Sequence, residues 1–170
     1  NPNGAIKNGR DFVTLKKFMD PDRTAPSSQA GFKDVIVMRL AEIYLIAAEA
    51  EFQLGHPEEA ANLVNVLRTR AAVKAPVDHT ADMQITGADI SIDFLLEERA
   101  RELCGEYMRW FDVKRMKGHS NGGEDFVDFI KSRNPDITQV QPFHTLRPIR
   151  QEELNALLNK DEFGQNEGYD

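Results

Sequence analysis

The sequence predicts a mainly α-helical fold, with a tetratricopeptide-like helical hairpin, further helices, long irregular loops and few short strands. Two observations lead to this prediction. Apolar residues recur with a period of about 3.6 residues within 35–54, 57–72 and 89–117, which is typical of helices that bury one face. The stretches between them are rich in Gly, Pro, Asn and Ser, which favour turns and loops.

The composition is that of one globular domain or of a piece of a larger one. The chain has 170 residues, of which 41% are hydrophobic and 29% are charged. Its formal charge is −7 and it has no long basic run, so we expect no nucleic-acid partner and no attraction to anionic lipids. No apolar stretch approaches the roughly 20 residues that a membrane-spanning helix needs.

Two regions follow from the pattern along the chain. Residues 1–34 are turn-rich, and their segment 11–20 is compatible with a short strand. We expect this region to continue an upstream one, because the chain has no initiating Met and reads as the middle of a longer protein. Residues 35–170 carry the helical patterns.

The centre of the second region predicts two helices joined by a tight turn. Residues 35–54 are apolar almost all round, as expected for a helix buried on several sides. Gly55 ends this helix, and the Pro that follows two residues later suits the first turn of the next helix, 57–72. Ala48, Gly55 and Ala60 stand where a tetratricopeptide repeat places small residues, so we favour a repeat-like hairpin over an ordinary one.

The remaining elements are shorter, apart from a third long helix. That helix is predicted at 89–117, with a split near Gly105. Residues 124–133 predict a short helix, residues 135–149 an extended loop or edge strand, and residues 150–159 a last helical segment.

The third helix carries four charges on or beside its apolar stripe. On a helical wheel Arg99 and Glu106 lie in the middle of the stripe, and Glu102 and Arg109 lie on its edge. Each Arg stands three residues from a Glu, so Arg99 can reach Glu102 and Arg109 can reach Glu106. We therefore predict that the four residues form a structural ion network.

Catalytic carboxylates and metal ligands are the alternative interpretations of these charges. Di-metal carboxylate bundles need Glu-x-x-His pairs, and none of the four His residues supplies one. There is no G-x-S-x-G, and no His is placed beside Cys104, which we expect to be a small buried residue. A glycosidase pair of carboxylates is a weak signal in any acidic chain. We predict no catalytic residue, no metal site and no cofactor.

Aromatic side chains are the other candidates for a binding role, because their flat faces can stack on sugar rings. Trp110 and Tyr44 fall on apolar helix faces, so we assign them to the core. Tyr107, at the edge of the stripe, and Phe143 and His144, in a loop, are the candidate ligand contacts.

Three segments together resemble the carboxy-terminal part of SusD/RagB proteins. They read "DVIVMRLAEIYLIAAEAEFQLGHPEEAANLVNVLRTRA", "LLEERARELCGEYMRWFDVKR" and "RPIRQEELNALLNKDEFGQNEGYD". The residues that follow the family patterns are Arg39, Ala41, Glu42, Tyr44, Leu45, Ala48, Glu49, Ala50, Asn65, Arg68, Arg70, Ala71, Glu98, Arg99, Glu102, Leu103, Glu106, Arg109, Asp112, Arg115, Pro148, Ile149, Glu153, Leu154, Gln165, Asn166, Gly168 and Tyr169.

The resemblance implies a non-enzymatic protein of polysaccharide utilisation. Proteins of this family bind glycans or other nutrients at the cell surface and pass them to a SusC-like TonB-dependent transporter in the outer membrane. They are lipoproteins, so membrane attachment would come only from a lipid anchor upstream of this chain, which is itself expected to be soluble. The motif residues in this chain are expected to maintain the fold.

Two other functions stay open at this point. The helical hairpin is also compatible with a tetratricopeptide-type scaffold that binds a protein partner, although only one repeat is visible. A carboxylate-based glycoside hydrolase is the least favoured alternative.

Overall fold

The structure is a computed structural model, which describes residues 15–25, 27, 30–115 and 126–169. The chain divides into two compact units, Asn1–Arg39 and Leu40–Asp170. The described residues of the first unit form loops and one short 3-10 helix, Lys16–Phe18. The Asp20 carboxylate closes this loop region, because it accepts the backbone N–H of Phe32 at 2.6 Å.

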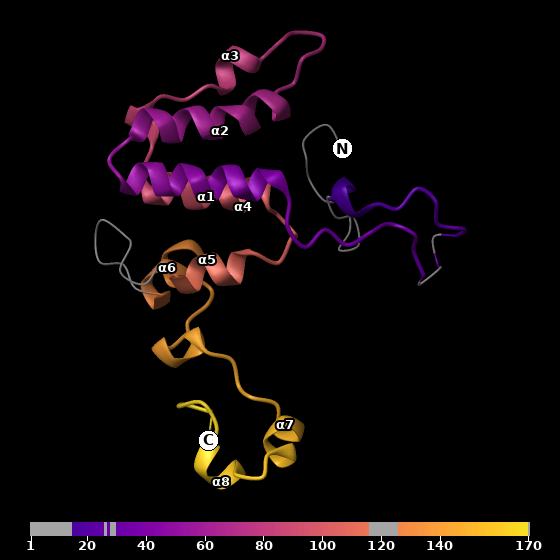
Figure 1. The fold of residues 1–170 in the computed structure, drawn as a ribbon, viewed down its shortest axis with the longest axis vertical. Coiled ribbons are helices and arrows are strands. Elements are labelled where there is room, and N and C mark those ends of the chain that lie inside the picture. The colour runs from indigo at the N-terminus through magenta and orange to yellow at the C-terminus, as the bar shows by residue number, and fades with distance from the viewer. Residues whose placement is uncertain (1–14, 26, 28–29, 116–125, 170) are drawn as a thin grey trace. The chain divides into compact units, whose positions relative to one another are not determined.

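The second unit begins with the predicted hairpin, which consists of α1 (Leu40–Gln53) and α2 (Pro57–Ala71). The two helices run side by side (Figure 1). Gly55 has a φ of 85° and so takes the left-handed conformation that ends α1. Ala48 and Ala60 are fully buried between the helices, because small side chains let the two backbones approach closely.

A polar connection leads from α2 to the third long helix. It contains α3 (Thr80–Met83) and the 3-10 turn Gly87–Asp89. The Asn65 side chain holds the connection against α2, because its amide bonds both the N–H and the carbonyl of Ile85, at 3.0 and 2.8 Å.

The third helix is split as predicted, into α4 (Ile92–Glu102) and α5 (Arg109–Arg115). Ser91 caps α4, because its hydroxyl accepts the N–H of Phe94 at 3.1 Å. Residues 103–108 form the turn between the helices, which we call the α4–α5 turn. Gly105 and Tyr107 have positive φ values of 79° and 64° in this turn.

The rest of the second unit contains α6 (Phe126–Arg133), the 3-10 turn Pro142–Thr145, α7 (Gln151–Ala156) and α8 (Lys160–Phe163). Two apolar clusters form its core. The first cluster joins α1, α2 and α4 and includes Leu45, Val64 and Leu95. The second joins α4, α5 and α6 and includes Leu96, Val113, Phe126 and Phe129.

The mainly α-helical fold class is confirmed, with three differences in detail. Helix α1 begins at Leu40 and not at residue 35, because the run 35–37 is β-branched and disfavours helix. Its outer face is open rather than buried, since Leu40, Ile43 and Ile46 are 67%, 45% and 47% exposed.

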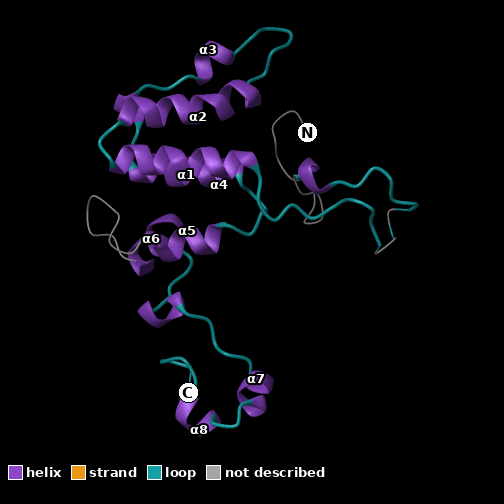
Figure 2. Ribbon diagram, in the orientation of Figure 1, coloured by secondary structure: helices purple, strands orange, loops and turns teal. Residues whose placement is uncertain are grey.

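The third difference concerns strands. The few short strands that the sequence predicts are absent from the described residues, which form only helices and loops (Figure 2). Lys16–Phe18 is a 3-10 turn, and residues 11–14 of the expected strand lie outside the described residues. In the segment 135–149 a side chain takes the place of a partner strand, because the Gln165 amide bonds the N–H and carbonyl of Ile149 at 2.7 and 2.8 Å.

Candidate functional site

Arg99 lies where α1, α4 and α5 meet, and only 3% of it is exposed. Its Nε donates to Asp112 Oδ1 at 2.8 Å, and its Nη2 lies 3.7 Å from Glu42 Oε1. Both carboxylates are buried as well. A buried charge needs such partners, because leaving it unpaired in the protein interior is costly. The third nitrogen, Nη1, is buried and has no hydrogen-bond partner among the described residues.

A second set of ion pairs joins α2 to α4. Arg68 donates two hydrogen bonds to Glu98, at 2.7 and 3.1 Å, and Arg101 donates another at 2.7 Å. Arg70 donates to both oxygens of Glu102, at 2.6 and 2.7 Å. Burial opposes ionisation of Glu98, but the bonds from the two arginines outweigh it and lower the pKa of this carboxyl.

Arg115 extends the charged contacts from α5 to α1. It bonds both oxygens of Glu49, and its Nε lies 3.4 Å from Asp112 Oδ1. The hydrogen bonds with Glu49 raise the pKa of Arg115, although burial opposes this shift. Together with Arg99, these contacts link α5 to two other helices.

Three of the four predicted network residues, Arg99, Glu102 and Arg109, make contacts with other helices. Arg99 pairs with α1 and α5, and Glu102 pairs with α2. Arg109 donates from Nη1 to the carbonyl of Leu96 at 3.0 Å and lies over the Phe129 ring. Burial lowers the pKa of Arg109. Glu106 is half-buried in the α4–α5 turn.

Sequence reasoning on one helix missed the partners on other helices, which are Glu42, Glu49, Arg68, Arg70, Asp112 and Arg115. One signal was available in the sequence. Glu42 lies at helical spacing from Leu45, so it falls on the buried face of α1, where an unpaired carboxylate would not be expected.

The three candidate ligand contacts have different environments. Tyr107 is 87% exposed. Phe143 and His144 are half-buried and pack on each other, with ring centroids 4.2 Å apart, and Tyr169 packs edge-on against Phe143 at 5.1 Å. His144 Nδ1 also accepts the N–H of Gln141 at 2.8 Å. The structure does not bring Tyr107 together with the other two.

The expectation that Cys104 is a small buried residue is wrong. The residue is exposed, because α4 ends at Glu102 and the helical spacing does not continue into the turn. Tyr44 and Trp110 are partly buried, and each packs against an apolar cluster.

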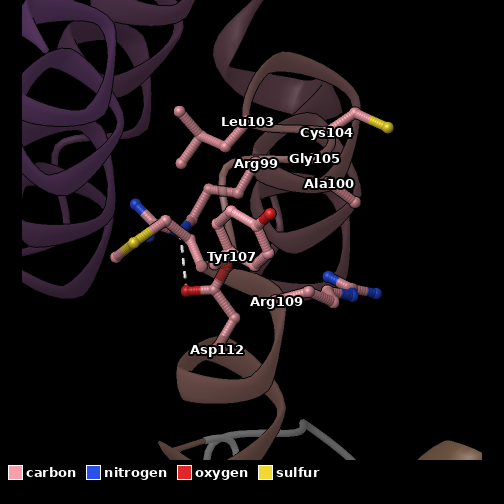
Figure 3. A pocket seen from close by; sticks show the side chains of 9 residues that line it. Arg99, Ala100, Leu103, Cys104, Gly105, Tyr107, Arg109 and Asp112 are labelled. Carbon is pink, nitrogen blue, oxygen red and sulfur yellow. Dashed lines mark hydrogen bonds and ion pairs between the residues drawn. The ribbon is translucent and has the colours of Figure 1, made fainter. Parts of the chain in front are cut away.

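Two hollows lie beside the Arg99–Asp112 pair. The smaller has a volume of about 170 Å³ and lies at the α4–α5 turn (Figure 3). The larger is a groove of about 440 Å³ between α1 and α5, with Ile46 and Phe111 among its lining residues. Both are lined by Arg99, Met108 and Asp112.

In the part of the chain that the structure describes, no three His, Cys, Asp or Glu side chains are grouped as they would be around a metal ion. The helices there are each too short or too polar to cross a bilayer.

The helices of the second unit and their α1–α2 hairpin define a mainly helical protein of the tetratricopeptide-like type. The model of the SusD family matches residues 5–169, and the chain belongs to this family. No solved structure matches the chain.

Three curated relatives come from Formosa agariphila. SusD-like protein P25 is 32% identical over 139 residues, which are 79% of this chain and 24% of the relative. SusD-like protein P38 is 38% identical over 86 residues, and SusD-like protein P2 is 41% identical over 85 residues; each match covers 48% of this chain and 17% of the relative. The matched stretches thus span a quarter or less of the length of these relatives.

Proposed function

We propose that this chain is the carboxy-terminal part of a glycan-binding protein that passes its ligand to a SusC-like TonB-dependent transporter. The observation that carries the proposal is the family match over residues 5–169. The residues that carry the SusD/RagB resemblance include both members of the Arg99–Asp112 pair. Residues of the family pattern therefore also hold α4 and α5 together.

The same family membership supports a place at the cell surface, on the outer membrane. Attachment would come from a lipid anchor upstream of residue 1. In this proposal the helical hairpin is the scaffold, and the turns and loops around it offer the contacts to ligand and transporter.

The charges in the core support a binding function rather than hydrolysis. A glycosidase needs one carboxylic acid that stays protonated to donate to the leaving group, which requires a raised pKa. Glu98 has a lowered pKa, because arginines bond both its oxygens. Glu102 and Asp112 are likewise bonded by arginine. These carboxylates are suited to holding helices together.

Tyr107 is the best of the three candidate ligand contacts. Its ring is exposed, whereas Phe143 and His144 are half-buried against each other and Tyr169. A glycan could stack on Tyr107 without any rearrangement of the fold.

Titration calorimetry of the chain with a panel of neutral and acidic oligosaccharides tests the proposal. We expect saturable binding of at least one member of the panel, and weaker binding by Tyr107→Ala. Phe163→Ala is the matched control, because Phe163 is also an exposed aromatic residue but lies in α8. Absence of binding across the whole panel would contradict a glycan-binding role for this chain.

A tetratricopeptide-type protein-binding scaffold is the second candidate, favoured by the exposed apolar face of α1. Leu40, Ile43 and Ile46 are the residues of this face. A peptide array distinguishes the two functions: specific peptide capture that Ile43→Glu abolishes, without glycan binding, would favour the scaffold.

A further inference from the structure

The outer face of α1 is apolar, although it is open to solvent. Four of the five exposed residues of this helix are apolar, and the five are Leu40, Ile43, Ile46, Ala50 and Gln53. The charged residues of α1 lie on other faces, where Glu42 is buried and Glu49 and Glu51 are half-buried. A surface helix usually turns polar side chains toward water, so this face is suited to a contact.

The other helix of the hairpin, α2, has the polar outer face that α1 lacks. Its exposed residues are Glu58, Glu59, Asn62, Val66, Thr69, Arg70 and Ala71, of which five are polar or charged. Val66 is as exposed as Ile46, at 46% against 47%, but it stands among these polar residues. The apolar character of the outer face is therefore particular to α1 and is not shared by the whole hairpin.

The spacing of the residues on this face indicates what kind of partner it fits. A stripe along the face consists of Leu40, Ile43, Ala47 and Ala50. Their intervals of three, four and three residues are those of the positions through which one helix contacts another. The two alanines lie next to each other in the stripe, and small side chains there let a second backbone approach closely. The face therefore fits an α-helix better than an extended peptide, whose side chains repeat every two residues.

The groove between α1 and α5 adjoins this face and has no unmatched charge for an ionic ligand. Its charged lining residues are Glu42, Glu49, Arg99, Asp112 and Arg115. Each of the two arginines forms ion pairs with two of the three carboxylates. Ile46 and Phe111 line the same groove and are 47% and 62% exposed. An occupant of the groove would therefore be held by apolar contacts.

The length of the relatives indicates where the covering helix comes from. The matched stretches are 17–24% of the three relatives, so most of each relative lies outside them. A tetratricopeptide-like hairpin is stable only when neighbouring helices cover its faces. The described residues that precede α1 supply only the three-residue 3-10 helix Lys16–Phe18. We therefore look for the covering helix further upstream in the same polypeptide.

We propose that an amphipathic helix from the upstream part of the full-length protein packs along the outer face of α1 and closes the groove between α1 and α5. Its apolar side contacts Leu40, Ile43 and Ile46, and its backbone lies against Ala47 and Ala50. The inference rests on the proposed function, in which this chain is the carboxy-terminal part of a longer protein. It adds an intramolecular interface, and it closes this face to the peptide that a protein-binding scaffold would capture there.

Thiol labelling of the full-length protein tests whether the face is covered. Cys104 is exposed and is first replaced by Ser. In this background Ile46→Cys and Val66→Cys are a matched pair, because the two residues are equally exposed in the chain but lie on different helices. Peptide mass spectrometry follows the reaction of each with a maleimide. We expect Ile46→Cys to react about tenfold or more slowly, because a covered thiol reacts only after local opening.

A charge placed on the face gives a second measurement that does not depend on labelling. Ile43→Glu should lower the urea midpoint of the full-length protein, because the new carboxylate loses its hydration beneath the covering helix. Val66→Glu is the matched control, since Val66 is 46% exposed and Ile43 is 45% exposed. Val66→Glu should leave the midpoint unchanged. If Ile43→Glu fails to fold, the labelling comparison still decides.

Cross-linking identifies the covering segment. A photoreactive side chain at position 46 of the full-length protein should cross-link to an upstream peptide of the same molecule, independently of protein concentration. Cross-links between two copies, or to another protein, would overturn the inference. Equal labelling rates for Ile46→Cys and Val66→Cys, or equal midpoints for Ile43→Glu and Val66→Glu, would overturn it as well.

Titration of the same full-length protein with neutral and acidic oligosaccharides separates this inference from the proposed function. Glycan binding together with equal labelling rates would overturn the interface alone. A slowly labelled Ile46→Cys together with no binding of any sugar would support the interface and contradict the glycan-binding function.

Discussion

Arg99 shows how a charged residue is accommodated in the core of this protein. Its guanidinium lies between Asp112 on α5 and Glu42 on α1, and all three residues are nearly inaccessible to solvent. Such a cluster adds little net stability compared with apolar packing, because each charge has lost its hydration. Its geometry nevertheless fixes how α1, α4 and α5 meet.

Removing one member of the cluster should lower the free energy of unfolding by much more than the small net contribution of the whole cluster suggests. Asp112→Ala leaves Arg99 without its closest partner and weakens the position of Arg115. We expect the free energy of unfolding in urea to fall by roughly 3–5 kcal/mol. Glu152→Ala is the control, because it breaks only an exposed pair with Arg150 and should change stability by less than about 1 kcal/mol. Similar losses in both variants would contradict a structural role for the buried cluster.

Gly168 lies so close to the Phe143 ring that this position has no room for a side chain. A Cβ at this position would lie 2.5 Å from the Phe143 ring, and its φ is 87°. Gly168→Ala should therefore displace Tyr169, whose hydroxyl donates to the carbonyl of Leu146 at 2.8 Å. We expect faster hydrogen exchange in residues 146–149, measured by mass spectrometry.

Gly164 gives the matched control for that measurement. It also has a positive φ, 66°, but nothing lies within 4 Å of an added Cβ. Gly164→Ala should carry only the backbone strain, roughly 1–3 kcal/mol, and should increase the exchange less. Equal effects would mean that the contact with Phe143 is not what holds the carboxy-terminal segment.

At the scale of elements, α4 is the helix that connects the rest of the second unit. Its Leu95 belongs to the first apolar cluster and its Leu96 to the second. Its charged residues reach α2 through Glu98 and Glu102, and reach α1 and α5 through Arg99. Neighbouring residues on one helix thus face different partners.

The stability that the Arg68–Glu98 ion pair adds between α2 and α4 should depend on pH, because Glu98 titrates. The pKa of Glu98 in the folded chain is below the ordinary value of 4.5. Its contribution to stability is therefore complete above pH 4.5 and is lost as the pH falls through the folded-state pKa. Glu98→Gln should be less stable than the unmodified chain at pH 7, and the difference should shrink below about pH 4.5. Urea unfolding at several pH values measures this.

Glu152→Gln is the control for the pH series, because Glu152 is exposed. Its difference from the unmodified chain should be small at every pH. A Glu98→Gln difference that stayed constant down to pH 3 would show that the charge of Glu98 does not stabilise the contact between the helices.

The sequence pattern was sufficient to predict the long helices and the breaks between them, but it did not predict which residues pair with the charged side chains. Gly55, the following Pro and Gly105 mark breaks that the structure contains. A helical wheel, however, suggests only partners on the same helix, and it assumes that the helix is continuous. The α4–α5 turn interrupts it, so residues after 102 do not keep the register of the wheel. Pairs such as Arg99–Asp112 arise from tertiary packing across that turn.

At the scale of the molecule, the second unit has two apolar clusters rather than one core. The first lies among α1, α2 and α4, and the second lies among α4, α5 and α6. Both depend on α4, and the Arg99 cluster joins α1 to α5 directly. This arrangement favours a single cooperative unfolding transition over the stepwise loss of two separate parts.

The single tryptophan makes that cooperativity measurable. Trp110 packs against the second cluster, edge-on to Phe126 with ring centroids 5.7 Å apart, so its fluorescence reports on that cluster. Leu45 belongs to the first cluster and is fully buried, and Leu45→Ala should lower the free energy of unfolding by about 2–5 kcal/mol. If the clusters are coupled, Leu45→Ala should lower the urea midpoints of the Trp110 fluorescence transition and of the circular dichroism transition by the same amount.

Ile43→Ala gives the control, because Ile43 lies on the same helix but is 45% exposed, so its truncation should shift both transitions much less. The decisive result is the fluorescence of Leu45→Ala. If its Trp110 fluorescence midpoint equals that of the unmodified chain while circular dichroism shows loss of helix at lower urea, the two clusters unfold separately. The shared helix α4 and the Arg99 cluster would then be too weak to couple the hairpin to the helices that follow it.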